Sequence, residues 1–314
     1  MKILITGGAG FIGSHLTDKL LSEGHKVLVI DNYQTGRRDN LKPHANLQII
    51  EGSIADKELV DETFDSFVPD RVVHAAASYK DPNNWMEDAQ TNVVGTINIA
   101  LASKKVGVKR LVYFQTALCY GLKPIEQPIT LSHPINSSGS SYAISKTAGE
   151  QYIELSGLDF ISFRLANAYG PRNLSGPLPT FYQRLTTNKP CFIMDTRRDF
   201  IYVDDLVDAV LKAIHGKGHK GYYHISSGSD YSIKELFDET LKVLNIKLDK
   251  EVEVRPRNPD DVFTILIDPT KTNMDFGWKA STPLRVGVKH AIEYYQKHGI
   301  QETYTHLKPV ESTK

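Results

Sequence analysis

The chain has little cysteine, with only Cys119 and Cys191 among its 314 residues. Two thiols this far apart cannot form a disulfide framework, and they lack the paired spacing of a zinc site, so we expect no metal centre. Small core cysteines that stay reduced are typical of the cytoplasm, which is where we expect the protein to act.

Net charge and long apolar runs are missing as well. The 37 Lys and Arg residues balance the 37 Asp and Glu residues, so no general field attracts nucleic acid or an anionic membrane. The first apolar run, Ile3–Ile5, is followed at once by glycines and is too short for a secretory signal. No stretch approaches the ~18–20 apolar residues of a membrane span. We therefore expect a globular protein with no nucleic-acid or membrane partner.

Short β-branched runs recur in the first half of the chain and alternate with segments of helical spacing. The runs are Lys2–Thr6, Lys26–Asp31, Leu47–Ile50, Arg71–Ala77, Arg110–Thr116 and Asp159–Leu165. They are continuous rather than alternating, which is typical of parallel strands covered on both faces. The order of elements predicts an α/β, doubly wound Rossmann fold.

The alternation breaks down after Leu165, where proline- and glycine-rich loops begin. Gly221–Ser227 resembles one further strand of the first sheet. We therefore predict a nucleotide-binding Rossmann domain of residues 1–165, to which residues 201–227 return. Residues 166–200 and 228–314 then form a smaller, discontinuous C-terminal α/β part that binds substrate.

A glycine loop follows the first strand and opens a helix. Gly7, Gly10 and Gly13 have the spacing at which one glycine permits a tight turn, one lets the backbone approach a pyrophosphate, and one lets the helix pack closely. The N–H groups at the start of the helix suit phosphate oxygens. The alternative is a glycine-rich turn with no ligand.

The second predicted strand ends in Asp31. A carboxylate at this place accepts hydrogen bonds from both ribose hydroxyls of a dinucleotide and repels a 2′-phosphate. NAD is therefore favoured over NADP. Arg37 and Arg38 lie just beyond this strand and keep NADP open as the alternative.

Tyr142 and Lys146 stand four residues apart in a segment with helical spacing, so they share a helix face. A lysine ammonium near a phenol stabilises phenolate and lowers the tyrosine pKa from about 10. The pair then suits a general base that takes a proton from an alcohol. An exposed helix pair without a function is the alternative.

Taken together with Thr116, these residues resemble the extended short-chain dehydrogenase/reductase family, and within it the NAD-dependent nucleotide-sugar epimerases and dehydratases. The segments "TNVVGTINI", "HAAA" and "GSIAD" are similar to further family motifs, with Ser53 standing where the family has aspartate. The resemblance implies an NAD site made of Gly7, Gly10, Phe11, Ile12, Gly13, Asp31, Asn32, Ser53, Ile54, Ala75, Ala76, Ala77, Asn92, Tyr142 and Lys146.

The resemblance also implies a nucleotide-sugar site. "RLANAYGPRN" suggests that Asn167 binds the diphosphate, and "RRDFIYVDDL" places Arg198 near the nucleotide. In "RPRNPDDV" the family's glycine is missing, and Arg257 is the arginine assigned to the diphosphate. Tyr79 is expected beside the sugar, either as a substrate contact or as loop surface.

The resemblance implies a first step in which Tyr142 takes the proton of a sugar hydroxyl while Thr116 positions that oxygen. A 4-keto sugar forms at a tightly bound NAD. The family's dehydratases carry an Asp-Glu pair directly after the threonine, and its decarboxylases an acid in the same turn. Here Ala117 and Leu118 occupy the positions of that pair. The remaining outcome is return of the hydride to the other face of the sugar, which is 4-epimerisation.

We therefore predict a UDP-hexose 4-epimerase that serves polysaccharide or lipopolysaccharide precursor synthesis. The alternatives are a 4-keto reductase, a decarboxylase or a 4,6-dehydratase of the same family, and a non-catalytic NAD-binding sensor. The family also implies a homodimer, formed through a four-helix bundle of the helices expected around Asp88–Lys104 and Tyr142–Ser156.

Overall fold

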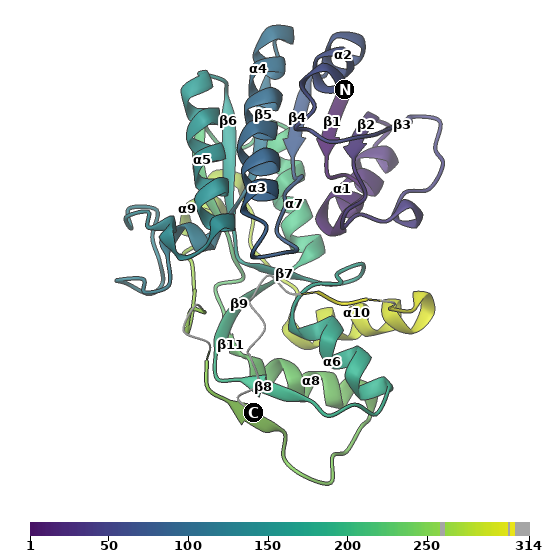
Figure 1. The fold of residues 1–314 in the computed structure, drawn as a ribbon, viewed down its shortest axis with the longest axis vertical. Coiled ribbons are helices and arrows are strands. Elements are labelled where there is room, and N and C mark those ends of the chain that lie inside the picture. Colours follow the sequence, from purple (N-terminus) through teal and green to yellow (C-terminus); the bar gives the residue numbers. More distant parts are fainter. Residues whose placement is uncertain (258–260, 301, 305–314) are drawn as a thin grey trace.

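Seven parallel strands form the main sheet of this computed structural model, which describes residues 1–257, 261–300 and 302–304 (Figure 1). In sheet order they are β10 (Gly221–Ile225), β6 (Phe160–Leu165), β5 (Arg110–Thr116), β4 (Arg71–His74), β1 (Lys2–Thr6), β2 (Lys26–Asp31) and β3 (Leu47–Glu51). Every neighbouring pair is parallel. The predicted Rossmann sheet is confirmed. The strand predicted over Arg71–Ala77 is too long, because β4 ends at His74.

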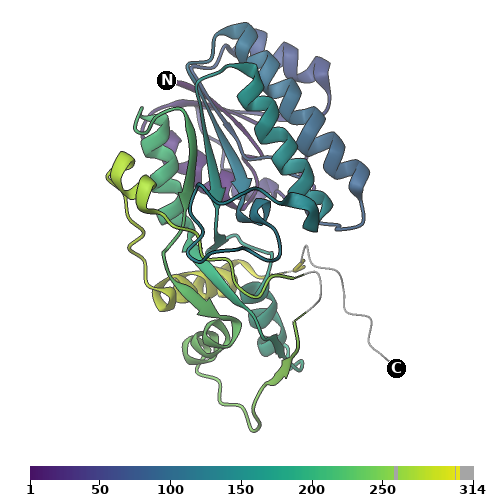
Figure 2. The same ribbon diagram turned by 90° about the vertical axis from the view of Figure 1, so that its left-hand side faces the viewer.

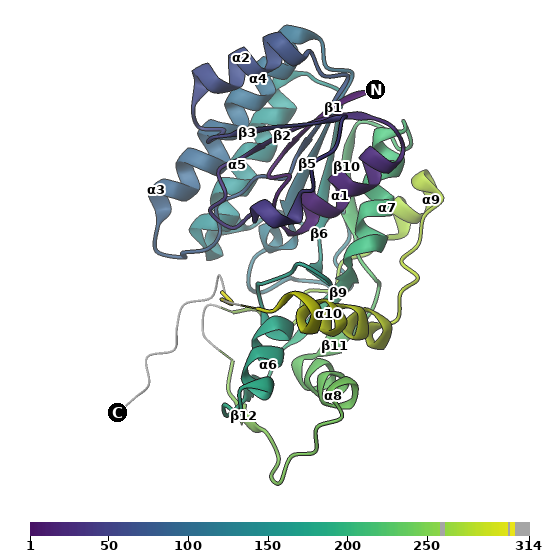
Figure 3. The ribbon, with the colours of Figure 1, turned by 90° about the vertical axis from the view of Figure 1, so that its right-hand side faces the viewer.

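Helices cover both faces of this sheet, as Figures 1 and 3 show. One face carries α2 (Lys57–Phe67), α4 (Thr96–Val106) and α5 (Ser141–Ser156), and the other carries α1 (Phe11–Ser22) and α7 (Val203–Ile214). Successive strand side chains point to opposite faces, so Leu4 packs with the α4 side and Ile5 with the α1 side. Burial on both faces explains why the strands read as continuous apolar runs.

A second part of the protein lies beyond the carboxyl ends of the sheet strands (Figure 1). Its strands are β7 (Asn167–Tyr169), β9 (Arg197–Tyr202) and β11 (Asp230–Ser232) in one sheet, and β8 (Phe192–Met194) and β12 (Glu253–Arg255) in another. Its helices are α6 (Pro177–Thr186), α8 (Ile233–Leu244) and α10 (Leu284–His298). Two short helices complete the fold, α3 (Trp85–Asp88) and α9 (Thr270–Phe276).

The chain crosses between the two parts more than once. β10 pairs with β6 in the main sheet, which is the return predicted for Gly221–Ser227. β9 belongs to the second part and continues directly into α7 of the first. We propose the division into residues 1–165 with 201–227, and 166–200 with 228–314, as the domain organisation. Among the described residues, the structure contains no helix with both the length and the apolarity of a membrane span.

Helix α5 is capped at both ends and is fixed to the sheet by a buried ion pair. The Ser140 side chain accepts a hydrogen bond from the Ala143 backbone at its start, and Gly157 ends the helix in a left-handed conformation. Glu150 lies 2.9 Å from Arg164 of β6, and both side chains are almost fully buried. A buried pair of this kind fixes the register of helix against strand, because an unpaired charge there is strongly destabilising.

Candidate active site

A cavity of about 1070 Å³ lies where the strands of the main sheet end and the second part begins. Residues that follow β1, β2, β4, β5 and β6 line it on one side, and residues of β7, β9 and α6 line it on the other. Most of the predicted site residues line this cavity, namely Gly7, Gly10, Phe11, Ile12, Gly13, Asp31, Asn32, Ser53, Ile54, Ala75, Ala76, Ala77, Tyr79, Thr116, Tyr142, Lys146, Asn167 and Arg198. Asn92 and Arg257 are not among its lining residues.

The glycine loop is pressed against the turn after β4. Gly7 has a φ of +70°, and a Cβ on it would lie 2.8 Å from the Ala76 nitrogen. A Cβ on Gly13 would lie 2.2 Å from the Gly7 carbonyl oxygen, so helix α1 begins closer to the loop than any side chain allows. The loop therefore presents bare backbone to the cavity at the start of a helix, which fits phosphate groups.

Asp31 ends β2 with its carboxylate inside the cavity wall. Its two oxygens accept hydrogen bonds from the backbone N–H groups of Ala9 and Tyr33, each at 2.8 Å. Burial raises the pKa of Asp31, and these hydrogen bonds oppose the shift. The carboxylate is thus held in place beside the glycine loop, where it suits ribose hydroxyls.

The arginines that favoured NADP are both engaged elsewhere. Arg37 binds Asp39 through two nitrogens, at 2.8 and 2.6 Å, and Arg38 binds Glu51 at 2.6 Å. Arg37 and Arg38 are also not among the cavity-lining residues. With an acidic Asp31 in the wall and its basic neighbours paired outside, the site fits NAD rather than NADP.

Other predicted cofactor residues have structural roles that are visible in the protein alone. Ser53 accepts a hydrogen bond from the Ala55 backbone at 3.2 Å and so shapes its own turn. Ile54 is 3% exposed and packs so closely on Gly95 that a Cβ there would lie 2.6 Å from it. Ile54 therefore forms part of an apolar wall, as expected of a residue that packs against an adenine ring.

Tyr142 and Lys146 share one face of α5 and line the cavity together with Thr116. Lys146 is 1% exposed, and its ammonium nitrogen lies 4.0 Å from the centre of the Tyr113 ring. Burial lowers the pKa of Lys146 to about 7, while Glu150 acts in the opposite direction. The lysine therefore titrates near neutrality.

The expected lowering of the Tyr142 pKa is wrong for the protein alone. Burial raises the pKa of Tyr142, and the nearby carboxylate of Asp88 raises it further. A buried lysine that is itself partly neutral offers little stabilisation to a phenolate. The phenol therefore carries its proton until further positive charge is brought into the cavity.

Asn92 acts behind the cavity wall rather than in it. Its amide oxygen accepts from the Ser78 backbone at 2.9 Å, and its amide nitrogen donates to the Ser78 carbonyl and the Ser145 hydroxyl, each at 3.0 Å. Asn92 is fully buried within a π-helical segment, Ala89–Gly95. It ties the turn after β4 to the helix that carries Tyr142 and Lys146.

A row of buried hydrogen bonds extends from Asn92 to the glycine-loop strand. The Thr96 hydroxyl donates its one hydrogen to the Asn92 carbonyl at 2.7 Å. The hydroxyl therefore accepts the hydrogen bond from His74 Nε2, which lies 2.9 Å away. His74 Nδ1 is then the acceptor for the Thr6 hydroxyl at 2.7 Å. Burial lowers the pKa of His74, and Lys146 lowers it further, which matches a neutral ring. Sequence reasoning did not identify His74 or Thr96, since only the fold brings them together.

The turn after Thr116 brings apolar groups to the cavity. The Thr116 hydroxyl accepts from the Leu118 backbone at 3.1 Å, which fixes the turn. Both Ala117 and Leu118 line the cavity. The carboxylates among its described lining residues come from Asp31, Asp81, Asp88 and Asp261. Each of these belongs to another segment of the chain.

The predicted substrate arginines meet at Asp261. Arg198 of β9 lines the cavity and donates through Nη2 to both Asp261 oxygens at 2.7 Å. Arg257 donates to the Asp261 carbonyl at 3.0 Å, and part of its predicted segment, residues 258–260, lies outside the described residues. Sequence reasoning missed Asp261 as the partner of these arginines. It also missed Arg184 of α6, a further cation in the cavity lining.

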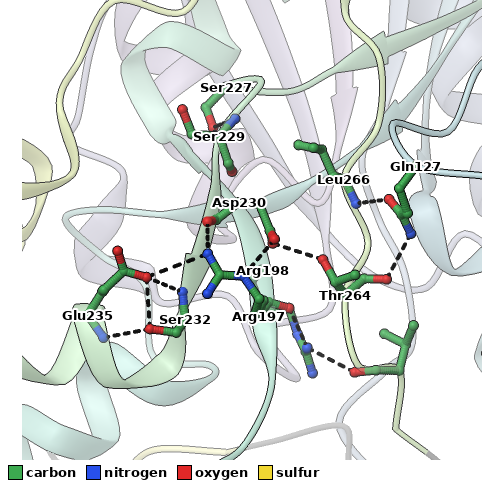
Figure 4. Close-up of polar contacts among 11 residues, drawn as sticks. Gln127, Arg197, Arg198, Ser227, Ser229, Asp230, Ser232, Glu235, Thr264 and Leu266 are labelled. Carbon is green, nitrogen blue, oxygen red and sulfur yellow. Dashed lines mark hydrogen bonds and ion pairs between the residues drawn. The ribbon is translucent and has the colours of Figure 1, made fainter.

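Arg197, the neighbour of Arg198, has a structural role (Figure 4). It binds Asp230 at 2.6 Å, and the other Asp230 oxygen accepts from the Thr264 hydroxyl at 2.8 Å. Gln127 in turn donates to the Thr264 carbonyl at 3.1 Å and accepts from the Leu266 backbone at 2.9 Å. These bonds tie the loop beyond Thr116 to the second part of the protein.

One group of metal-type ligands lies apart from the cavity, although we expected no metal centre. Glu23, His25 and His215 bring their ligand atoms within 4.8 Å of one another at the surface. None of the three is among the cavity-lining residues. Glu23 and His25 lie in the turn after α1, but His215 follows α7, so the sequence gave no sign of the complete group.

Comparison with known proteins places these features in context. The family model described as the NAD dependent epimerase/dehydratase family matches residues 3–226. UDP-glucose 4-epimerase of Mycolicibacterium smegmatis is 32% identical over 318 residues, which cover 94% of this chain and 99% of the relative. UDP-glucuronic acid decarboxylase 6 of Arabidopsis thaliana is 33% identical over 314 residues, which cover 92% and 87%.

Two solved structures from Bordetella bronchiseptica have the same fold. The enzyme WbmH in complex with NAD+ has a TM-score of 0.92 and 53% identity, covering 95% of this chain and 99% of that one. The enzyme WbmG in complex with NAD and UDP has a TM-score of 0.91 and 46% identity, covering 98% of each chain. At these identities the likeness extends beyond the fold to about half of the aligned residues.

The shifted pKa of Lys146 predicts a pH-dependent stability of the NAD-free protein. The folded protein releases this proton near pH 7, while the unfolded chain holds it to about pH 10.4. The unfolded chain thus binds more protons between these values, so the free energy of unfolding rises with pH there, by up to about 1.4 kcal/mol per pH unit.

Denaturant unfolding of the wild type and of Lys146→Met at several pH values measures this difference. Lys104→Met, at an exposed position of α4, is the control that keeps the wild-type slope, and an unchanged slope in Lys146→Met would contradict the prediction.

Proposed function

The chain belongs to the NAD-dependent epimerase/dehydratase family, and from this premise we propose that it inverts carbon 4 of a UDP-hexose. The observation that carries the proposal is the apolar turn of Ala117 and Leu118, which lines the cavity directly after Thr116. Breaking the C5–H bond, as dehydration requires, needs an acid and a base near carbons 5 and 6. Moving one hydride from carbon 4 and one proton from its hydroxyl needs no acid or base at carbons 5 and 6.

We assign the NAD site to the glycine loop, Asp31 and the turn after β4. The bare backbone of the loop suits the pyrophosphate and Asp31 suits the ribose, with Ala75–Ala77 and Ile54 as apolar walls. NAD held there would supply the acceptor and later the donor of the hydride of carbon 4, and its positive charge would favour the ionised form of a nearby phenol. Asn92 supports the site through Ser78 and Ser145 without lining it.

The chain's own part in the reaction is the movement of one proton. We assign Tyr142 as the base that takes the proton of the 4-hydroxyl and later returns it, with Thr116 as the hydrogen-bond partner that positions the oxygen. Lys146 stands one helical turn from Tyr142 and adds positive charge when protonated. Because the same proton goes out and comes back, the reaction needs no further acid or base.

The far side of the cavity supplies the candidate substrate contacts. We assign Asn167, Arg198 and Arg257 to the nucleotide diphosphate, with Tyr79 beside the sugar. The guanidinium of Arg198 is held by Asp261 in the protein alone. A diphosphate at this place therefore shares Arg198 with Asp261, or replaces Asp261 as the partner of Arg198. Bidentate binding by arginine suits both carboxylate and phosphate.

Decarboxylation of a sugar acid is the second candidate function. It is favoured by the likeness to the plant UDP-glucuronic acid decarboxylase, which is 33% identical to this chain, against 32% for the mycobacterial 4-epimerase. The apolar turn argues against it, because decarboxylases of the family carry an acid there. A 4-keto reductase would consume reduced cofactor stoichiometrically, and a sensor has no need of Tyr142 and Lys146. Service in polysaccharide precursor synthesis and a cytoplasmic location remain predictions.

The catalytic assignment is tested by Tyr142→Phe on a panel of UDP-glucose, UDP-N-acetylglucosamine and UDP-glucuronic acid, with the configuration at carbon 4 followed by NMR. We expect the variant to keep its NAD and to lose at least ~10²-fold in rate, the scale of a general base. Tyr152→Phe, at an exposed position of the same helix, is the matched control and stays near wild type. Near-normal turnover by Tyr142→Phe would remove Tyr142 from the mechanism. Release of carbon dioxide with a pentose product would instead support the decarboxylase.

We further propose that the protein is a homodimer formed through α4 and α5. These helices pack side by side on the outside of the sheet (Figure 2). They expose large apolar side chains, namely Leu101 (55% exposed), Ile144 (52%) and Leu155 (79%). Apolar side chains gathered on one face in this way are typical of an interface.

Light scattering during gel filtration tests the dimer. We expect the wild type to have twice the mass of one chain, and the double variant Leu101→Glu/Leu155→Glu to have the mass of one chain, because two desolvated charges oppose an apolar interface. Met274→Glu, at a 71% exposed apolar position of α9, is the control that stays dimeric. A wild type that elutes as a monomer at micromolar concentration would contradict the proposal.

A further inference from the structure

The last described segment of the chain, residues 302–304, returns from the end of α10 to the region between the two parts (Figure 3). The Tyr304 backbone N–H donates to the Leu174 carbonyl, and the Tyr304 carbonyl accepts from Gly176, both at 3.1 Å. These bonds form a parallel bridge between Tyr304 and Ser175. Ser175 and Gly176 line the cavity on its substrate side, just before α6. The backbone of Tyr304 is therefore bonded to a loop of the candidate sugar site.

The side chain of Tyr304 reaches to the opposite wall. Its hydroxyl oxygen lies 2.9 Å from that of Tyr79, and the Thr35 side chain lies near it and acts to lower its pKa. The ammonium nitrogen of Lys80 lies 5.9 Å from the centre of its ring. Tyr79 and Thr35 both line the cavity, and they follow strands β4 and β2 of the main sheet. Tyr304 thus joins two cavity loops that are far apart in the sequence and lies beside a third.

Tyr79 links Tyr304 to the proposed base. The ring centres of Tyr79 and Tyr304 are 5.8 Å apart, and those of Tyr79 and Tyr142 are 6.1 Å apart, both at tilted angles typical of aromatic pairs. With its hydroxyl held by Tyr304, the Tyr79 ring stays against the Tyr142 ring. The three tyrosines form a continuous series from the end of the described chain to the catalytic helix.

We propose that Tyr304 is a positioning residue that closes the cavity, holding its cofactor wall to its substrate loop and keeping Tyr79 against Tyr142. The inference rests on the proposed function where it concerns the sugar reaction. A cofactor that takes a hydride and later returns it must stay bound between the two transfers, since its loss strands an oxidised sugar. Bonds between the two walls of the cavity slow that loss by holding two of its loops together.

The release of NAD from the purified holoenzyme tests this proposal. Protein loaded with radiolabelled NAD is mixed with an excess of unlabelled NAD, and the loss of bound label is followed with time. We expect release from Tyr304→Ala to be about 10-fold faster or more, and release from Tyr304→Phe to be about 3-fold faster, because the latter loses only the hydroxyl contacts. Tyr294→Ala removes another tyrosine of the C-terminal region, one that stacks on His298, and keeps the wild-type rate.

A second measurement separates positioning from general stability. Tyr79→Phe and Tyr304→Phe remove the two ends of one hydrogen bond, so the double variant is expected to release NAD no faster than the faster single variant. This cycle also decides the question if Tyr304→Ala fails to fold. Release rates within about twofold of wild type in every Tyr304 variant, or fully additive effects of the two phenylalanines, would overturn the proposal.

Cofactor release is measured without sugar turnover, so the result does not depend on which reaction the enzyme catalyses. If no UDP-hexose is inverted and yet Tyr304→Ala releases NAD faster, the proposed function is wrong and the role of Tyr304 stands. If inversion occurs and the release rates are unchanged, the role of Tyr304 is wrong and the proposed function stands. Where turnover is present, the expected additional sign is a KM for the UDP-hexose that rises more than kcat falls.

Discussion

The geometry of the candidate site depends on the hydrogen bonds of one buried amide, that of Asn92. This side chain bonds both to the turn that follows β4 and to Ser145 of α5, between Tyr142 and Lys146. Separating the two elements would leave this buried amide without hydrogen-bond partners, which is unfavourable in free energy. The hydrogen bonds through Thr96 and His74 extend the same constraint to β1, from which the glycine loop begins. The turn after β4, strand β1 and helix α5 are thereby held as one unit.

Burial also determines how Tyr142 and Lys146, the proposed catalytic groups, carry their protons. The pKa of Lys146 falls to about 7, and that of Tyr142 rises, because both lie in surroundings that disfavour charge. In the protein alone the site therefore holds a neutral phenol beside a lysine near its own titration point. A cation that binds next to Tyr142 favours the phenolate, which links the activity of the base to the presence of the cofactor.

The local parts of this account could be predicted from the sequence. The main-sheet strands, the glycine loop and the Tyr142–Lys146 pair depend on periodicity and short spacing, and the structure contains each of them, although β4 ends at His74, before its predicted end at Ala77. Contacts between distant segments could not be predicted. The pairing of Arg198 with Asp261, the row through His74 and Thr96, and the return of Tyr304 to Tyr79 all arise from the fold. The expected pKa of Tyr142 had the wrong direction because burial, which opposes charge, has no signature in a four-residue spacing.

The central claim is that the apolar turn after Thr116 limits the enzyme to hydride and proton transfer at carbon 4. Incubation of the NAD-loaded enzyme with a UDP-hexose in D₂O, followed by NMR and mass spectrometry of the product, tests this most directly. The account predicts inversion at carbon 4 with no carbon-bound deuterium, because the only carbon–hydrogen bond that breaks exchanges its hydrogen with the cofactor. Deuterium at carbon 5 or carbon 6, or loss of carbon dioxide from UDP-glucuronic acid incubated in parallel, would contradict it.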